Sequence, residues 1–107
     1  MTARFLVLWS PPTDVQAFEA HYAEVHIPLA NRLPRLRSYT VSRNVRLVRG
    51  ETPYYLVGEL EWDSLEDQRE DFRSDEGRAT AQDVEVLSQW SPGVLSMTYE
   101  TEETHRG

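Results

Sequence analysis

The sequence predicts one α+β domain whose strands and helices follow the order βαββαβ. Three observations support this prediction: four runs with strand character, two regions with helical periodicity, and turn-forming Pro or Gly residues between them. A chain of 107 residues has the length of one domain with a single core. We therefore expect residues 1–107 to form one unit with a polar tail at about residues 103–107.

Each strand is predicted from its own pattern. The run 4–9 is apolar on both alternating faces, which is typical of a strand covered on both sides. Residues 37–48 and 54–62 alternate with period two and are separated by a turn at 50–53. The last strand, at about 94–102, follows the Pro-Gly pair that ends the preceding helix.

The first helical region is expected from Asp14 to about Leu33. Its apolar stripe has the spacing i, i+4, i+7, i+11 and consists of Phe18, Tyr22, Val25 and Leu29. Pro28 has no N–H, so we expect a kink where the carbonyl of Glu24 loses its helical partner. The second region is predicted as two helices, one at 64–73 with Ser64 as its N-cap and one at 76–90. The predicted stripe of the last helix is Ala79, Asp83, Val86, Leu87 and Trp90.

This order of elements is ferredoxin-like and implies a four-stranded antiparallel sheet with both helical regions on one face. Because the first strand is apolar on both sides, the open face of the sheet also needs cover. A homodimer that pairs sheet to sheet would provide this cover and can enclose a cavity.

The composition argues against several classes of function. The net charge of −7 disfavours nucleic acids and anionic membranes as partners, because both require a basic surface. The chain has no cysteine, which excludes disulfides, thiol catalysis and cysteine-based zinc sites. The apolar run near the N-terminus is too short for a signal peptide core or a membrane span, so we expect a cytoplasmic protein.

Three polar residues are candidates for catalysis. His26 lies at the predicted kink beside the apolar stripe, and an unperturbed imidazole suits proton transfer near neutral pH; alternatively, it satisfies the carbonyl left free at the kink. Tyr39 can orient His26 or donate to a substrate oxygen that gains negative charge, or it only packs across the sheet. Asp83 lies in an apolar stripe, where a carboxylate must be paired; it orients a histidine or is a structural partner.

The remaining candidates concern metals and ligands. His21 lies five residues before His26, whereas helical metal pairs are four apart, so we expect the two rings on different faces. His105 lies in the tail, and we expect no metal site. Large side chains at strand or helix spacing form either the core or the wall of a ligand pocket; these are Trp9, Tyr22, Leu29, Trp62, Phe72 and Trp90.

Several short motifs resemble the EthD family of the dimeric α+β-barrel superfamily. They are His26-Ile-Pro28-Leu29, the run Leu33-Pro34-Arg35-Leu36-Arg37-Ser38-Tyr39, Trp62-Asp63-Ser64, and the stretch from Ser74-Asp75-Glu76-Gly77 to Asp83. The resemblance extends from Phe5 to about Tyr99. It implies a homodimer with a cavity in each subunit, between the sheet and the helices. It also implies acid/base chemistry without a cofactor, in which a first-helix histidine and a second-strand tyrosine recur; His26 and Tyr39 match them. Arg35 departs from the pattern, since many relatives have glycine there. Haem binding, with His26 as axial ligand, is an analogy to the superfamily alone.

Two functions from different classes follow from the sequence. The first is a small cofactor-free enzyme that isomerises, dehydrates, decarboxylates or cyclises a hydrophobic, aromatic or polyketide-like molecule, with His26 moving the proton and Tyr39 stabilising oxyanion character. The second is a non-catalytic binding protein for an apolar metabolite, in which His26 only orients the ligand. A purely structural dimer with a filled core is a third alternative. A nicotinamide-dependent reductase is disfavoured, because the chain lacks the Gly-x-Gly-x-x-Gly motif.

Overall fold

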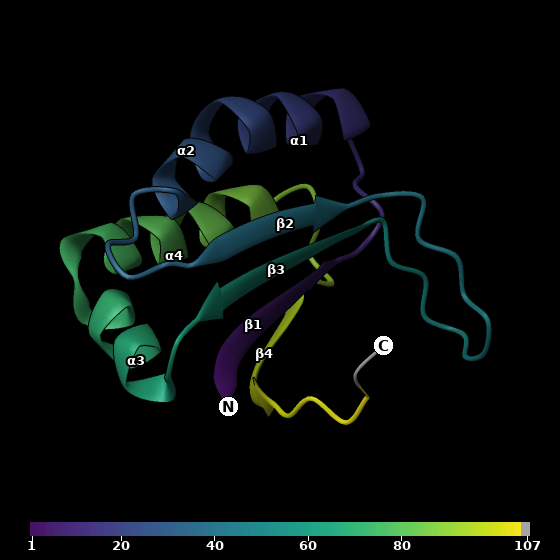
Figure 1. The fold of residues 1–107 in the computed structure, drawn as a ribbon. Helices are drawn as coiled ribbons and strands as arrows, with labels where there is room; N and C mark the ends of the chain where they lie inside the picture. Colours follow the sequence, from purple (N-terminus) through teal and green to yellow (C-terminus); the bar gives the residue numbers. More distant parts are fainter. Residues whose placement is uncertain (106–107) are drawn as a thin grey trace.

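The computed structural model describes residues 1–105, and over these residues the elements follow the predicted order (Figure 1). The first helical region consists of three consecutive segments and the second of two helices. The elements are β1 (Thr2–Trp9), α1 (Val15–His21), the π-helical turn η1 (Tyr22–His26), α2 (Ile27–Ala30), β2 (Ser38–Ser42), β3 (Leu56–Trp62), α3 (Leu65–Arg73), α4 (Asp75–Ser88) and β4 (Leu95–Thr101). No helix among the described residues has the length and apolar character needed to cross a membrane.

The four strands form one antiparallel sheet in the order β2-β3-β1-β4, and the helices cover one of its faces (Figure 1). This arrangement confirms the predicted ferredoxin-like fold. Because successive side chains of a strand point to opposite faces, every second residue of β1 and β3 faces the helices. The buried apolar residues on this face are Ala3, Val7, Trp9, Leu56, Leu60 and Trp62.

Two groups of buried side chains form the core between the sheet and the helices. The larger group contains Trp9 of β1 with Phe18 and Tyr22 of the first helical region. The Trp9 and Phe18 rings meet edge to face with centroids 5.5 Å apart, and the Phe18 and Tyr22 rings stack at 5.6 Å. The smaller group contains Leu33 and Trp62. The larger group places Phe18 of α1 and Tyr22 of η1 over Trp9 of β1.

Pro28 disturbs the first helical region as predicted, but it does so through a widened turn. In η1 the N–H of Ile27 donates to the carbonyl of Tyr22, five residues earlier. The α-helical pattern resumes with the N–H of Asn31, which donates to the carbonyl of Ile27. Pro28 has no N–H to donate, so regular α-helical hydrogen bonding is interrupted at this residue. The π-helical turn lies directly before it.

The widened turn also changes which residues face the core. The predicted stripe is wrong at Val25, which is 38% exposed, and Leu29 is only half-buried. The buried positions are instead Phe18, Tyr22, His26 and Ala30. A π-helical turn contains one residue more than an α-helical turn, so positions after it are rotated about the helix axis. The predicted stripe of α4 is likewise wrong at Val86, which is exposed.

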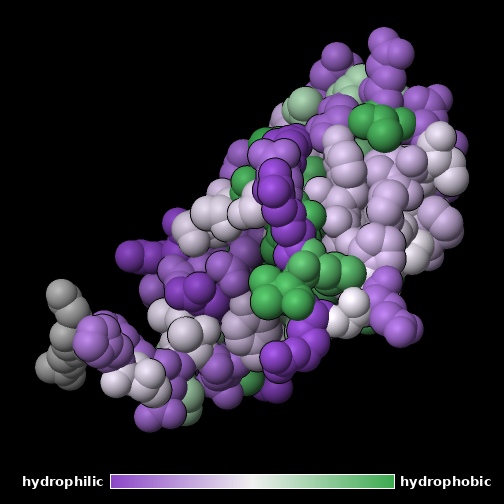
Figure 2. Space-filling view, turned by 90° about the vertical axis from the view of Figure 1, so that its right-hand side faces the viewer, coloured by the Kyte–Doolittle hydropathy of each residue, from purple (hydrophilic) through white to green (hydrophobic). Residues whose placement is uncertain are grey.

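The second strand is shorter than predicted. β2 ends at Ser42 rather than at residue 48, and residues 43–55 form a loop that projects beyond the sheet (Figure 1). Asn44 and Gly50 have φ angles of 58° and 112°, a left-handed conformation that a regular strand does not contain. Figure 2 views the side from which this loop projects and shows hydrophobic side chains within a largely hydrophilic surface.

Among residues 1–105, no helix covers the second face of the sheet. Leu95 and Met97 of β4, which are 45% and 42% exposed, lie there opposite two leucines of β1. The centre of this face is polar, because the Arg4 guanidinium lies 3.2 Å from the Glu59 carboxylate and 2.9 Å from that of Glu61. The predicted need for an apolar cover therefore applies to the β1–β4 half of the face.

Candidate functional site

A buried carboxylate on α4 connects the two histidines of the first helical region. His21 Nε2 lies 2.7 Å from Asp83 Oδ1, and His26 Nδ1 lies 2.9 Å from Asp83 Oδ2. An ionised carboxylate can only accept, so we assign both ring nitrogens as donors. Asp83 and His26 are each 6% exposed. The carboxylate is thus paired at both oxygens, as its position in the buried stripe requires.

The turn η1 brings both histidines to the same carboxylate. The sequence prediction that their rings lie on different faces assumed α-helical spacing, and it is wrong. In a π-helical turn residue i pairs with residue i+5, so side chains five positions apart project in similar directions. His21 and His26 have this spacing and flank η1. The sequence signal for the widened turn is Pro28.

Burial sets the protonation of His26. Desolvation lowers the pKa of this imidazole below its usual value, the hydrogen bond and charge of Asp83 act to raise it, and the neighbouring His21 acts to lower it. The ring packs against Tyr22, with centroids 5.1 Å apart, and against Trp9, at 6.1 Å. Within residues 1–105 we find no hydrogen bond to Nε2. A neutral His26 with Nδ1 bound to Asp83 therefore presents Nε2 as a proton acceptor.

Two phenol groups lie next to this histidine. The hydroxyl oxygens of Tyr22 and Tyr39 are 2.5 Å apart, which joins η1 to β2. Burial raises the pKa of Tyr22 to about 12 and raises that of Tyr39 as well, so both phenols are protonated at neutral pH. Gly58 of β3 leaves the space for this pair: a Cβ there would lie 3.3 Å from the Tyr22 hydroxyl and 3.8 Å from Tyr39 Cε1. The two tyrosines have two O–H groups but make only one hydrogen bond with each other. One O–H is therefore free to donate to a third group.

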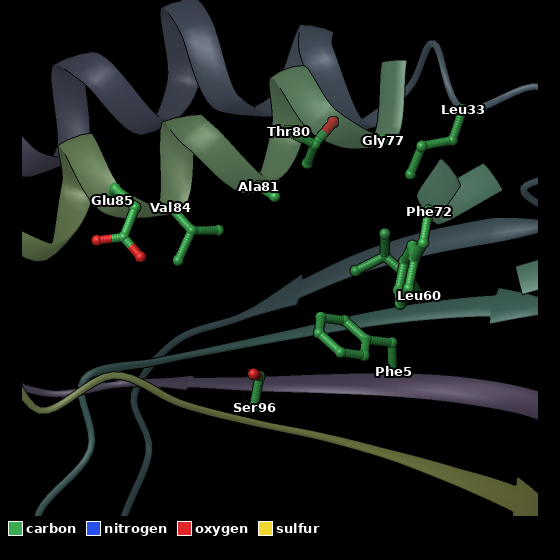
Figure 3. A pocket seen from close by; sticks show the side chains of 10 residues that line it. All are labelled: Phe5, Leu33, Leu60, Phe72, Gly77, Thr80, Ala81, Val84, Glu85 and Ser96. Carbon is green, nitrogen blue, oxygen red and sulfur yellow. The ribbon is translucent and has the colours of Figure 1, made fainter. Parts of the chain in front are cut away.

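An apolar pocket of about 370 Å³ lies beside this cluster, between α4 and the sheet (Figure 3). Val84, the residue after Asp83 on α4, lines it and also packs against the aromatic group that contains Trp9 and Tyr22. Leu60 lines it too and pairs with Tyr39 across β2 and β3. The five residues His21, Tyr22, His26, Tyr39 and Asp83 are called the polar cluster below. The pocket borders this cluster, but none of the five residues lines it.

The polar atoms of the pocket lie mainly near one end. Figure 3 places the carboxylate of Glu85 and the hydroxyl of Ser96 near this end, with Leu33 and Phe72 at the other. The Thr80 hydroxyl points away from the pocket and donates to the carbonyl of Glu76 at 2.8 Å. The lining residues are Phe5, Leu33, Leu60, Phe72, Gly77, Thr80, Ala81, Val84, Glu85 and Ser96.

The structure brings the three catalytic candidates, His26, Tyr39 and Asp83, into one neighbourhood. His26 binds Asp83 directly, whereas Tyr39 binds Tyr22, whose ring packs on His26. His26 does not serve as the partner of a free helical carbonyl, because its Nδ1 is directed to Asp83.

The ligand-contact candidates are divided between the pocket and the core. Phe72 lines the pocket. Trp9 and Tyr22 are buried beside His26, Trp90 packs on His21 at 5.8 Å, and Leu29 is half-buried on α2. Trp62 donates its indole N–H to the buried Asp71 at 2.7 Å. A ligand contact for these other residues stays a prediction.

Sequence reasoning missed most of the pocket and one member of the polar cluster. The spacing of His21 and His26 argues against a common site if the helix is α-helical. Phe5, Leu60 and Val84 fit ordinary strand or helix patterns. Nothing in their residue types marks them as pocket residues, since they are ordinary core side chains whose packing leaves a space. One signal for His21 was available: Asp83 is predicted on the buried face of another helix, where its carboxylate needs partners.

Comparison with known proteins identifies relatives over nearly the whole chain. A protein of Rhodococcus erythropolis, described as an uncharacterized 11.0 kDa protein in the thcB-thcC intergenic region, is 27% identical over 101 residues, which is 94% of this chain and 95% of that protein. The crystal structure of an ethyl tert-butyl ether d (EthD) family protein from Bacillus halodurans is 32% identical, with a TM-score of 0.82 over 95% of this chain and all of that one.

More distant structures share the fold. A hydroxynitrile lyase from Passiflora edulis has a TM-score of 0.70 at 15% identity, over 98% of this chain and 97% of that chain. A cofactor-independent oxygenase from Streptomyces nogalater has a TM-score of 0.66 at 16% identity, over 96% and 95%. A dimeric ferredoxin-like protein of unknown function from Bacteroides fragilis has 0.64 at 20% identity, over 94% and 96%.

The family model described as the EthD domain matches residues 10–89, three quarters of the chain. This segment contains the first helical region, β2, β3, α3 and α4, and hence every member of the polar cluster. The chain belongs to the EthD family.

Proposed function

We propose that this protein is a small enzyme that performs acid/base chemistry on a hydrophobic molecule containing a carbonyl, enol or phenol group. The observation that carries the proposal is the buried Asp83–His26 pair, which fixes Nδ1 of His26 and leaves Nε2 without a partner among the described residues. A general base requires an unprotonated nitrogen held in one orientation, and the lowered pKa of His26 favours that state at neutral pH.

The two tyrosines supply the complementary group. As His26 removes a proton next to a carbonyl, negative charge develops on the substrate oxygen, and the free phenol proton of the Tyr22–Tyr39 pair donates to it. Isomerisation, dehydration and cyclisation can use such a step. Decarboxylation forms the same kind of oxyanion when CO2 leaves, and the proton is then delivered to the carbon rather than removed from it. Two structures with the same fold are described as a hydroxynitrile lyase and a cofactor-independent oxygenase, which supports enzymatic use of this architecture.

The pocket indicates the character of the substrate. Its wall is predominantly aromatic and aliphatic, and its volume suits a molecule of one to three rings. A substrate that occupies the pocket lies against Val84 and Leu60. We propose that the reacting atom reaches His26 Nε2 past these two side chains, because Val84 also packs against the aromatic group around Trp9 and Leu60 pairs with Tyr39.

The proposal is tested with 2-tetralone, an aromatic ketone with acidic hydrogens next to its carbonyl. Solvent deuterium incorporation at that carbon, followed by NMR, reports proton abstraction without knowledge of the natural product. We expect the His26→Ala variant to lose about 10²-fold or more of the enzyme-dependent exchange, the usual scale of acid/base catalysis. The matched control is His105→Ala in the tail, which leaves the rate unchanged. Exchange at equal rates in the wild type and His26→Ala would exclude His26 as the base.

A binding protein without catalysis is the second candidate, and one observation favours it. The pocket is lined by neither His26 nor Tyr39. For a carrier, 2-tetralone would bind and protect the protein against unfolding, with no deuterium exchange above the buffer rate. Phe72→Ala would then weaken binding while His26→Ala would not.

We also propose that the protein is a homodimer that covers the β1–β4 half of the open sheet face. The exposed Leu95 and Met97 support this assembly, and so does the dimeric state of the Bacteroides fragilis structure. Sedimentation velocity at micromolar concentration is expected to give the dimer mass, and a monomer would contradict the proposal.

A further inference from the structure

We infer that His21 is a positioning residue for the proposed base: it holds the positive charge that balances Asp83, and so keeps His26 neutral. This inference rests on the proposed role of His26, although its test requires no substrate. The geometry that supports it is one carboxylate shared by two imidazoles, at 2.7 Å and 2.9 Å.

One carboxylate balances one positive charge. If His26 alone faced Asp83, only its burial would oppose the attraction of the carboxylate for a proton on Nε2. A second imidazole on the other oxygen changes this balance, because it can hold the proton in place of His26. The two histidines then titrate as a coupled pair rather than independently.

The surroundings decide which ring holds the charge. The His21 side chain is 23% exposed and that of His26 is 7% exposed, so a cation is better hydrated at His21. The His21 ring also lies 5.8 Å from the ring of Trp90, whose π electrons attract a cation. His26 is enclosed instead by Tyr22 and Trp9.

The other groups packed around His26 do not supply this charge. On its own helical region the neighbouring titratable group is Tyr22, which is neutral at neutral pH because burial raises its pKa to about 12. Tyr39 of β2 reaches the site only through Tyr22 and is neutral as well. β1 contributes the uncharged Trp9, and α4 contributes Asp83. His21 is thus the one cationic group placed against this carboxylate within residues 1–105.

The widened turn η1 is what allows the two histidines to contact the same carboxylate. In a regular α-helix, residues five apart are about 140° apart around the axis, and two such rings would not meet one carboxylate. The π-helical turn aligns them, and such turns are frequent at functional sites. The turn thereby gives one histidine access to solvent and the other access to the core.

The test is a pH titration of the histidine rings by NMR on the full chain, which contains three histidines. The decisive variant is His21→Gln, whose amide N–H still donates to Asp83 Oδ1 but carries no charge. With the cation gone, we expect the pKa of His26 to rise by about one unit, the lower end of the shift caused by a nearby carboxylate.

A merely structural His21 would give a different result. The His21→Gln variant would then leave the titration of His26 unchanged, because the hydrogen bond is retained, and this outcome would overturn the inference. His21→Phe serves as the second variant, and the same rise of the His26 pKa is expected in it. His105→Gln controls for a general effect of removing a histidine. Failure of 2-tetralone exchange, in contrast, bears on the proposed function and not on this charge balance.

Discussion

Asp71 and Asp83 are two buried carboxylates in the same helical layer, and their partners differ in kind. Asp71 accepts from the indole N–H of Trp62 at 2.7 Å, from the backbone N–H of Arg35 at 3.0 Å and from its guanidinium at 3.4 Å. None of these donors gains or loses a proton near neutral pH. Asp83 has two imidazoles as partners, and imidazole is the side chain type that can gain or lose a proton near neutral pH. A carboxylate with permanent donors fixes the structure, whereas one with titratable donors can take part in proton transfer.

The position of Arg35 supports this distinction. Its main contact with Asp71 uses the backbone N–H, which every residue except proline provides. The side chain adds an ion pair at 3.4 Å from a position that is 47% exposed. Such a half-exposed pair contributes little to stability.

The isosteric change Asp71→Asn is expected to have the largest effect on stability. Both oxygens of Asp71 face donors, so one N–H of an asparagine would point at another N–H in either orientation. Breaking a buried charged network in this way costs about 3 kcal/mol. Urea unfolding of the variant measures the change in the free energy of unfolding. A loss below about 1 kcal/mol would show that the hydrogen bonds of Asp71 contribute little to the stability of the fold.

The matched change Asp83→Asn is expected to cost less, about 1 kcal/mol at pH 8. A neutral imidazole can either donate or accept, so His26 can donate to the asparagine oxygen while His21 accepts from its nitrogen. The same urea measurement checks the value. The chemistry should change more than the stability: without the carboxylate, which raises the pKa of His26, that pKa falls further. An equal loss of stability in the two Asn variants would remove the distinction between the two carboxylates.

Much of the fold could be predicted because its signals are local. The Pro-Pro and Pro-Gly pairs mark turns, Ser64 accepts from the N–H of Asp67 as a cap should, and the apolar alternation of β1 and β3 selects their buried faces. The failures occurred where local pattern and long-range structure disagree. Residues 43–48 alternate like a strand, yet the sheet offers them no partner, and left-handed residues at 44 and 50 turn the chain away.

The site was predictable only in its components. His26, Tyr39 and Asp83 were identifiable as polar residues on otherwise apolar faces. Their pairing could not be predicted, because it depends on how η1 packs against α4. These two elements are more than fifty residues apart in the sequence. The second partner of Asp83 was hidden for a further reason: the spacing of His21 and His26 excludes a common face in an α-helix and favours one only in a π-helical turn.

The pH dependence of stability should reveal the burial of His26. Burial lowers the pKa of His26 in the folded state below its unfolded value of about 6.5, so between the two values only the unfolded chain binds the proton. Stability therefore rises with pH through this window, by at most about 1.4 kcal/mol per pH unit, and is lost as the pH falls below about 6.5. The lowered pKa of Glu19 acts in a separate window, below pH 4.5. Urea unfolding between pH 5 and 8 should show a shallower slope in His26→Gln than in the wild type, whereas His105→Gln keeps the wild-type slope. Equal slopes in the wild type and His26→Gln would mean that His26 is as easily protonated in the core as in water, and that its burial does not prepare it to act as a base.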